Sequence, residues 1–359
     1  MLLRQPRYFK DFRCIGGACT DSCCVGWEIP IDNETNARYQ SQPGAFGERL
    51  RAGISAPKDG HFLLREGRCP FLNRQGLCEI ILEMGEEALC QICADHPRYY
   101  NRLPGRVEAG LGLCCEAAGR LIFSDPRPVE WDCFPAEGEE PPAALPDDTA
   151  ALLSARDTAL ALLQNRRAPL RVRLRRLLFY ALEWQDSLDM GLPYPAGPPA
   201  DDGAEEPSPA DYRALLVFFA GREAICPGWP ARLQALSDEL PRLLAAAPAF
   251  CRALGGRLYE YERLAVYYAD RYFIQAAEDG ELLPRVKFAI ASLLVQLLLD
   301  LSLWLEKGEY TPADRIHTAK AYAKEMEYSE ENLAAFLKAS WELDCLASER
   351  LAAMLGPLP

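Results

Sequence analysis

The chain has 359 residues and a formal net charge of -13. It is long enough to bury a large hydrophobic core, so it does not need disulfide bonds for stability as small secreted domains do. Its negative charge would repel phosphate backbones, which argues against general nucleic-acid binding. Residues 1–7 lack the apolar stretch of a signal peptide, and we therefore expect a cytoplasmic protein.

The cysteines are concentrated at the start of the chain, where eleven of the fourteen lie within the first 133 residues. They form tight groups at residues 14–24, 69–78, 90–93 and 114–115. Thiols at such spacing can converge on one metal ion or iron–sulfur cluster, and in a reducing compartment clustered cysteines are more often metal ligands than disulfides. Residues 1–133 are therefore predicted to form a cysteine-rich metal- or iron–sulfur-binding region of loops and short helices, with a small hairpin near Arg106–Phe123.

The spacing of these thiols does not match a single zinc finger. Only Cys90 and Cys93 form a C-x-x-C pair, and the irregular remainder suits an iron–sulfur cluster or two metal sites at least as well. A radical S-adenosylmethionine motif would begin with Cys19 and Cys23, but its third cysteine is replaced by Gly26. The radical motif is therefore absent.

Single residues of this region have simpler explanations. Cys115 and Cys133 are more simply interpreted as buried packing residues. His96 follows the C-x-x-C pair closely enough to complete or orient a metal site, although a packing role in the turn before Pro97 is the simpler interpretation.

The composition changes after residue 133. Residues 134–148 are acidic and Pro-rich and are predicted to form a linker or surface loop. From residue 149 onward the chain shows helical periodicity, which predicts a helical domain over residues 149–359. The predicted fold class is mainly α, with an irregular cysteine-rich metal-binding N-terminal region packed on a C-terminal helical bundle. The expected helices cover residues 148–166, 169–190, 209–221, 229–247, 256–278, 283–306, 312–326 and 329–355.

Local signals refine this helical region. Thr311 followed by Pro312 predicts a capped helix start, and Ser329 gives a partial capping pattern. Residues 191–210 are too rich in Pro and Gly for regular structure and are predicted to be a mobile surface loop. The basic strip Arg166–Arg176 is interpreted as a solvated helix face, with docking to an acidic partner as the alternative.

The apolar segment Phe288–Leu305 is nearly long enough to cross a membrane. Gln296 and Asp300 would then lie in lipid, which is costly, and no second segment of this kind exists in the sequence. We therefore expect a core helix that is buried by its neighbours, and no membrane insertion.

Aromatic and acidic residues are concentrated between residues 259 and 273. Their spacing predicts an aromatic packing seam, with a cage for a cationic group as the alternative. If the protein is an enzyme that deprotonates an amine, Tyr272, Glu260 and Asp270 are the candidates for the general base.

Several motifs resemble one protein family. The string YFKDFRCIGGACTDSCCVGWEIPID at residues 8–32, CPFL with GLC between Cys69 and Cys78, LCQICADHPR at residues 89–98 and LGLCCEAAG at residues 111–119 resemble the flagellin lysine-N-methylase (FliB) family. The same cysteine pattern is similar to the zinc- or iron-chelating (YkgJ-like) proteins. The segment YYADRYF at residues 267–273 resembles the C-terminal helical region of the FliB family.

The resemblance implies transfer of a methyl group from S-adenosylmethionine to lysines of flagellin, with a [4Fe-4S] cluster involved. Because the radical motif is missing, our hypothesis is that the cluster anchors the cofactor through an iron without a cysteine ligand and does not generate a radical. By the match of motifs, the candidate metal ligands are Cys19, Cys23, Cys24, Cys69, Cys78, Cys90 and Cys93, with Cys14 and Cys114 next.

The sequence is also compatible with two functions other than methyl transfer. The first is a non-catalytic protein in which zinc or iron folds the N-terminal third, and the second is an iron–sulfur protein that transfers electrons. The identity of the bound metal and the binding of S-adenosylmethionine discriminate between these hypotheses.

Overall fold

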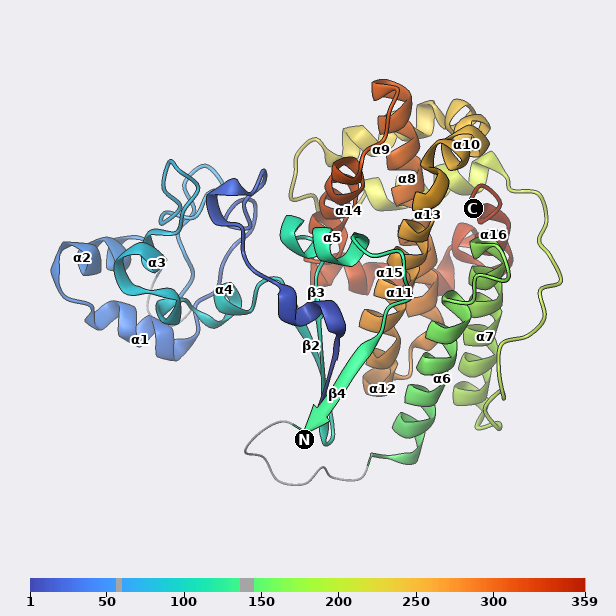
Figure 1. The fold of residues 1–359 in the computed structure, drawn as a ribbon, viewed down its shortest axis with the longest axis horizontal. Helices are drawn as coiled ribbons and strands as arrows, with labels where there is room; N and C mark the ends of the chain where they lie inside the picture. Colours follow the sequence, from blue (N-terminus) through green and yellow to red (C-terminus); the bar gives the residue numbers. More distant parts are fainter. Residues whose placement is uncertain (56–59, 136–144, 359) are drawn as a thin grey trace.

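The computed structural model describes residues 1–55, 60–135 and 145–358. It consists of a cysteine-rich lobe, a central four-stranded sheet and a large helical bundle, which lie from left to right in Figure 1. The predicted mainly α fold class is confirmed, and the sheet between the two predicted parts is an addition to it.

The cysteine-rich lobe comprises residues 14–55 and 60–96 and projects from the body of the molecule (Figure 1). Its first helix begins after Asp32, whose side chain accepts a hydrogen bond from the N–H of Thr35 at 2.9 Å. Packed aromatic side chains, including Tyr39, Phe62 and Phe71, give the lobe a hydrophobic cluster of its own. Its short helices are α1 (Asn33–Ser41), α2 (Gly44–Ala52), α3 (Glu79–Met84) and α4 (Gln91–Asp95), with 3-10 turns at Gly16–Ala18 and Glu86–Ala88.

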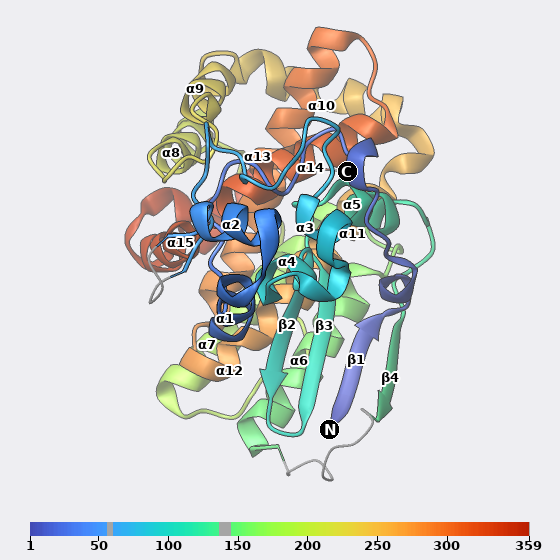
Figure 2. The same ribbon diagram turned by 90° about the vertical axis from the view of Figure 1, so that its left-hand side faces the viewer.

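The sheet has the strand order β2-β3-β1-β4. Strands β2 and β3 form an antiparallel hairpin, while β1 pairs in parallel with β3 and antiparallel with β4. The first strand of the chain therefore lies in the middle of the sheet (Figure 2). The strands are β1 (Leu2–Pro6), β2 (Arg98–Leu103), β3 (Arg106–Leu111) and β4 (Trp131–Pro135).

The predicted hairpin near Arg106–Phe123 is wrong in its extent. Arg106–Leu111 is the second strand of the hairpin, and the first strand precedes it, because Gly105 in the left-handed region (φ 67°) closes the turn. Residues Glu116–Phe123 form helix α5 instead, which packs against α14 through its apolar face.

The predicted linker 134–148 overlaps two elements. Its first two residues complete β4, and α6 (Asp147–Leu163) begins before the linker was expected to end. Residues 136–144 lie outside the described part of the chain. The domain boundaries at residues 133 and 149 stay predictions.

Most predicted helices of the bundle are present, and three of them are divided. The expected helix 256–278 is interrupted by a 3-10 turn at Phe273–Gln275. The expected helix 229–247 breaks at Glu239, because Pro241 favours the start of a new helix. The expected helix 329–355 breaks at Leu343, whose backbone is extended. The helices after α6 are α7 (Leu170–Met190), α8 (Pro209–Ala220), α9 (Trp229–Asp238), α10 (Leu240–Leu254), α11 (Tyr259–Tyr272), α12 (Ala276–Asp279), α13 (Leu282–Lys307), α14 (Pro312–Met326), α15 (Glu330–Glu342) and α16 (Ser348–Met354).

The predicted caps of α14 and α15 are confirmed. Thr311 and Asp314 form a reciprocal capping box, and the Ser329 side chain accepts from the N–H of Asn332. The segment 191–208 is irregular, as predicted, but it is fastened to α7. Tyr194 stacks on Trp184 at 4.1 Å between ring centroids.

The basic strip Arg166–Arg176 is not the solvated helix face that was predicted. Arg173 and Arg175 are buried, because each pairs with a carboxylate: Arg173 with Glu262 at 2.7 Å and Arg175 with Asp201 at 2.5 Å. The strip therefore fastens α7 to its neighbours, and only part of it faces solvent.

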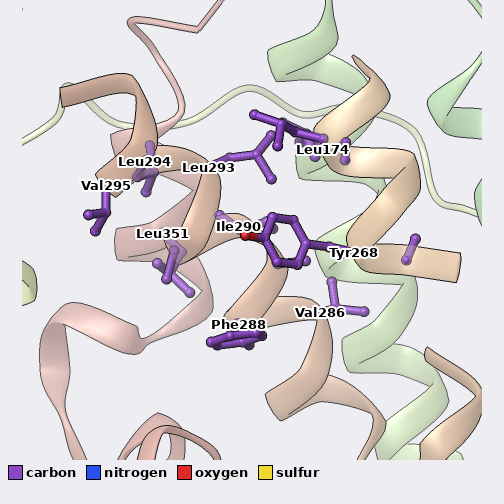
Figure 3. Close-up of a cluster of buried hydrophobic side chains, with 14 of the residues drawn as sticks. Leu174, Tyr268, Val286, Phe288, Ile290, Leu293, Leu294, Val295 and Leu351 are labelled. Atoms are coloured by element: carbon purple, nitrogen blue, oxygen red, sulfur yellow. The ribbon is translucent and has the colours of Figure 1, made fainter. Parts of the chain in front are cut away.

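Helix α13 is the centre of the bundle. Its residues 282–301 are all buried, and Figure 3 shows Phe288, Ile290 and Leu293 among side chains from α7, α11 and α16. Among the described residues, α13 alone is long and apolar enough to cross a membrane, but 78% of its most apolar window is buried inside the protein. The predicted core helix is confirmed.

Gln296 and Asp300 of α13 have hydrogen-bond partners inside the core. Asp300 accepts hydrogen bonds from Tyr261 at 2.6 Å and Tyr310 at 2.5 Å, and it pairs with the buried Arg315. Gln296 donates to the Tyr268 hydroxyl at 2.9 Å. These contacts offset the cost of burying polar groups in an apolar helix.

The sheet is joined to the bundle by buried ionic contacts. Arg4 of β1 donates to Asp270 of α11 at 2.7 Å, and the Trp131 indole donates to the same carboxylate at 3.1 Å. Glu108 of β3 accepts from Arg156 of α6, with one N–O distance of 3.0 Å. The side chains of both arginines are at most 6% exposed. Removing either partner of a pair would therefore leave the other charge buried without compensation.

We expect Glu108→Ala to lower the free energy of unfolding by about 3–5 kcal/mol, because it leaves Arg156 buried without its carboxylate. Glu130→Ala is the matched control, since Glu130 pairs with Arg7 at the surface, where a loss below about 1 kcal/mol is expected. Urea unfolding followed by circular dichroism measures both. Equal losses would contradict the dependence of Arg156 on Glu108.

Candidate functional site

Thiols of the cysteine-rich lobe gather around its hydrophobic cluster. Cys24 and Cys69 are joined by a backbone hydrogen bond of 2.8 Å. Cys78 and Cys90 each stand directly before a short helix, α3 and α4 respectively. The predicted ligands that belong to this cluster are Cys24, Cys69, Cys78, Cys90 and Cys93. We call them the lobe thiols.

Backbone N–H groups are directed at several lobe thiols. The sulfur of Cys78 receives them from Ile80 and Ile81, and the sulfur of Cys69 receives one from Phe71. Such contacts stabilise thiolates, which are the form of cysteine that binds metals. Without a metal, burial dominates and raises the pKa of Cys69 to about 12 and the pKa of Cys78 above its ordinary value.

Two pairs of thiols share a hydrogen bond. The bond between Cys23 and Cys24 lowers the pKa of Cys24 to about 7 and raises that of Cys23. The bond between Cys90 and Cys93 likewise lowers the pKa of Cys90 and raises that of Cys93. In each pair the hydrogen bond favours the thiolate form of one sulfur, Cys24 or Cys90, while Cys23 or Cys93 keeps its proton.

The lobe thiols suit a thiophilic metal by donor type but are not arranged around one point. Within residues 1–55, 60–135 and 145–358, no three His, Cys, Asp or Glu side chains are spaced as ligands of a single ion. The structure therefore places five predicted ligands at the hydrophobic cluster of the lobe, but the described residues do not form a metal site there.

The remaining thiols of the first third lie near a different element. Cys115, at the start of α5, interacts electrostatically with Cys19 and Cys14, and Cys23 interacts with Cys115 and Cys14. Cys114 lies apart from them and is 1% exposed. The structure thus brings Cys115, rather than Cys114, toward other cysteines.

A cleft of about 530 Å³ lies beside the lobe thiols. Helix α4 separates the cleft from the lobe thiols. Cys90 and Cys93 contact the hydrophobic cluster of the lobe, while Gln91 and Ile92 line the cleft. The cleft is lined by Pro30, Ile31, Asp32, Gln91, Ile92, Asp95 and His96 of the lobe, Arg98 of β2, and Tyr328 of the bundle.

Four side chains from distant segments meet at the wall of this cleft. Trp27 stacks on Tyr328 with ring centroids 5.1 Å apart. The Tyr328 hydroxyl lies 3.5 Å from Nδ1 of His96 and accepts the thiol proton of Cys114 at 2.6 Å. Nε2 of His96 is 3.9 Å from the Cys114 sulfur.

His96 is neutral at physiological pH. Burial, together with the ammonium groups of Lys320 and Lys324, lowers its pKa to about 4. The neutral imidazole can accept a hydrogen bond, and it stands at the cleft wall, where a substrate can reach it.

A buried carboxylate lies directly behind Tyr328. Glu327 accepts hydrogen bonds from Tyr267 at 2.5 Å, Arg271 at 2.8 Å and Tyr272 at 3.0 Å. Burial raises the pKa of Glu327 above its ordinary value. These bonds fix the chain at the end of α14, from which Tyr328 extends into the cleft wall.

The three predicted general bases are engaged inside the protein. Tyr272 donates to Glu327, Asp270 accepts from Arg4, and Glu260 is held by Arg257 at 2.8 Å. The aromatic seam predicted around them is present, with their hydroxyl groups bonded to internal carboxylates. The assignment of the general base stays a prediction.

No motif in the sequence marks Glu327 and Tyr328. The two residues follow the last turn of α14 without a motif, and Trp27 is 301 residues away from Tyr328 along the chain. His96 was noticed only as a neighbour of the C-x-x-C pair.

The first cysteine loop is clamped to the body. The N–H and hydroxyl of Thr20 donate to Glu116 of α5 at 3.0 and 2.7 Å. Asp21 pairs with Lys320 at 3.4 Å and Lys324 at 3.1 Å, both from α14. These contacts hold the segment that contains Cys19, Cys23 and Cys24 against the bundle.

The comparisons with known proteins concern the bundle. Residues 218–354 match the model of the FliB lysine N-methylase C-terminal domain. Over these residues the chain is similar to the FliB family. The matched residues include Glu327 and Tyr328, whereas the cysteine-rich lobe precedes them. The resemblance seen in the sequence is therefore confirmed from the C-terminal half.

Curated proteins with flagellar and lysine-N-methylase names are also similar to the chain. The chain is 28% identical over 136 residues to the flagellar biosynthetic protein FliU of Salmonella muenchen, which covers 34% of this chain and 77% of that protein. It is 30% identical over 130 residues to a lysine-N-methylase of Salmonella choleraesuis and 27% identical over 136 residues to that of Salmonella typhimurium, each covering 34% of this chain. The chain spans 32% of the length of these two enzymes. No solved structure matches the chain.

We expect Glu116→Ala to accelerate amide hydrogen exchange about tenfold across residues 14–24, because Thr20 loses both of its hydrogen bonds to α5. Mass spectrometry of peptic fragments measures the exchange. Glu79→Ala, which removes a partner of Arg49 on the lobe surface, is the control and leaves these residues unchanged. Unaltered exchange in Glu116→Ala would show that the clamp does not hold the loop.

Proposed function

We propose that this FliB-family chain is an S-adenosylmethionine-dependent protein-lysine N-methyltransferase that acts on flagellin in the cytoplasm. The observation that supports it most directly is the match of residues 218–354 to the FliB lysine N-methylase C-terminal domain. The names of the relatives, lysine-N-methylase and flagellar biosynthetic protein, point to a flagellar substrate. The neutral His96 beside an open cleft adds a chemical reason.

The methyl transfer requires an uncharged lysine amine. Its nitrogen forms a bond to the methyl carbon while the bond from that carbon to the sulfonium breaks, and the sulfur leaves as a neutral thioether. The product nitrogen is an ammonium, which releases its extra proton to solvent, while the neutral ring of His96 accepts a hydrogen bond that orients the incoming amine. The ammonium groups of Lys320 and Lys324, which act on His96, also disfavour a charged lysine in the cleft.

We propose that the lobe thiols hold a [4Fe-4S] cluster. Cys24, Cys69, Cys78, Cys90 and Cys93 supply more thiols than the three that a cluster with one open iron takes. When bound, the cluster would hold the amino and carboxylate groups of the methyl donor. The adjacent walls formed by α4 and Tyr328 would then exclude water and orient the lysine.

We expect the protein purified without oxygen to contain about four iron and four sulfide ions per chain. Cys69→Ser and Cys90→Ser should each lower the iron content strongly, because both sulfurs lie in the lobe cluster. Cys226→Ser is the control, since Cys226 is exposed and far along the chain, and its iron content should be unchanged. Stoichiometric zinc without sulfide would contradict the cluster and favour a structural metal-binding module.

We expect His96→Asn to lower the rate of methyl transfer to purified flagellin by about 10²-fold, because the amine loses the imidazole that orients it. Transfer of a labelled methyl group from S-adenosylmethionine measures the rate. His317→Asn is the control, because His317 lies on α14 and does not line the cleft. An unchanged rate would remove His96 from this role, and formation of 5′-deoxyadenosine would contradict direct transfer.

A further inference from the structure

A second cavity, of about 440 Å³, lies at the start of α7 and away from the cysteine-rich lobe. It is formed where the connection between α6 and α7 meets the start of α11. Its lining residues are Pro126, Arg166, Arg167, Ala168, Pro169, Leu170, Arg173, Gly256, Leu258, Tyr259 and Glu262. We call it the arginine cavity.

The arginine cavity is positively charged in a protein of net charge -13. Arg166 and Arg173 both bind the same carboxylate, that of Glu262, at 2.8 and 2.7 Å. Arg167 is exposed, and its guanidinium has no partner in the described part of the chain. Three guanidinium groups against one carboxylate leave an excess of two positive charges.

The backbone adds further donors. Helix α7 has 21 residues and begins at Leu170, and its cap residue Pro169 offers no side-chain acceptor for the first-turn N–H groups. These groups and the helix dipole favour an anion at this end of the helix. Arg173, whose side chain is 8% exposed, has its Nε buried without a hydrogen-bond partner.

The opposite wall is apolar and fixed. Leu258 and the ring of Tyr259 line the cavity, and the Tyr259 hydroxyl is held by the carbonyl of Phe123 at 2.8 Å. A small ligand can therefore place an anionic end among the arginines and a flat or apolar end against Tyr259.

We propose that the arginine cavity binds the phosphate group of a small phosphorylated molecule. Guanidinium groups match phosphate oxygens with paired hydrogen bonds, and a phosphate dianion balances the excess of two positive charges. The cavity includes none of the residues of the cleft beside His96, so this site is independent of the proposed methyl transfer.

Calorimetric titration of the full chain with inorganic phosphate and with ATP tests this proposal at low ionic strength. Both should bind, and Arg167→Ala should weaken them about tenfold, as loss of one charge-assisted hydrogen bond does. This variant keeps the fold, because the Arg167 side chain has no internal partner. Arg213→Ala, on the exposed face of α8, is the matched control and should bind as the unchanged protein does.

The outcomes separate the possible ligands. Tighter binding of ATP than of inorganic phosphate supports a nucleotide, and equal binding supports the phosphate group alone as the ligand. Malonate that binds as tightly as phosphate would overturn the assignment in favour of carboxylates. The proposal would also be overturned if neither phosphate nor ATP bound, or if Arg213→Ala weakened binding as much as Arg167→Ala.

Discussion

The buried carboxylate of Asp270 joins the first strand of the chain to the centre of the helical bundle. It accepts from Arg4 and from the Trp131 indole, so it fixes both β1 and β4 against α11. Glu108 and Arg156 make the equivalent connection between β3 and α6. Because buried charges are costly when unpaired, the sheet has one favourable position on the bundle.

That position decides where the cysteine-rich lobe lies. The lobe is inserted between η1 (Arg7–Asp11), which follows β1, and β2, which begins at Arg98. Both ends of the lobe therefore start from a sheet that the bundle holds in place, as Figure 2 shows. Glu116 and the two lysines of α14 then clamp the first cysteine loop, and Trp27 stacks on Tyr328. The cleft therefore forms between the lobe and the bundle, and both are held in place by the sheet and by these contacts.

Charge is distributed unequally within this acidic protein. Lys320 and Lys324 place two ammonium groups beside the cleft, where they act on His96 and bind Asp21. At the start of α7, Arg166 and Arg173 share the carboxylate of Glu262, and Arg167 lies beside them without a carboxylate of its own among the described residues. Both sites are local exceptions to the overall charge, and each suits a ligand that the rest of the surface would not retain.

Features that depend on local spacing were predictable from the sequence. Helical periodicity located most of the bundle, the Thr311 cap marked the start of α14, and the apolar run of α13 indicated a core helix. The grouping of the cysteines was equally visible, because close spacing alone makes thiols neighbours. The motifs in the first 120 residues and the match of residues 218–354 point to the same FliB family.

Features that depend on distant segments were decided only by the tertiary structure. The sequence could not show that β1 pairs with β3 across about 100 residues, or that Arg4 reaches Asp270. Nor could it show that Cys115 faces other thiols while Cys114 faces Tyr328, since adjacent residues look alike until their surroundings are known. The sequence determined the helices and the sulfur-rich composition through short-range periodicity. The cleft and its His96 environment arose from long-range packing, because burial and neighbouring charge exist only once the chain has folded.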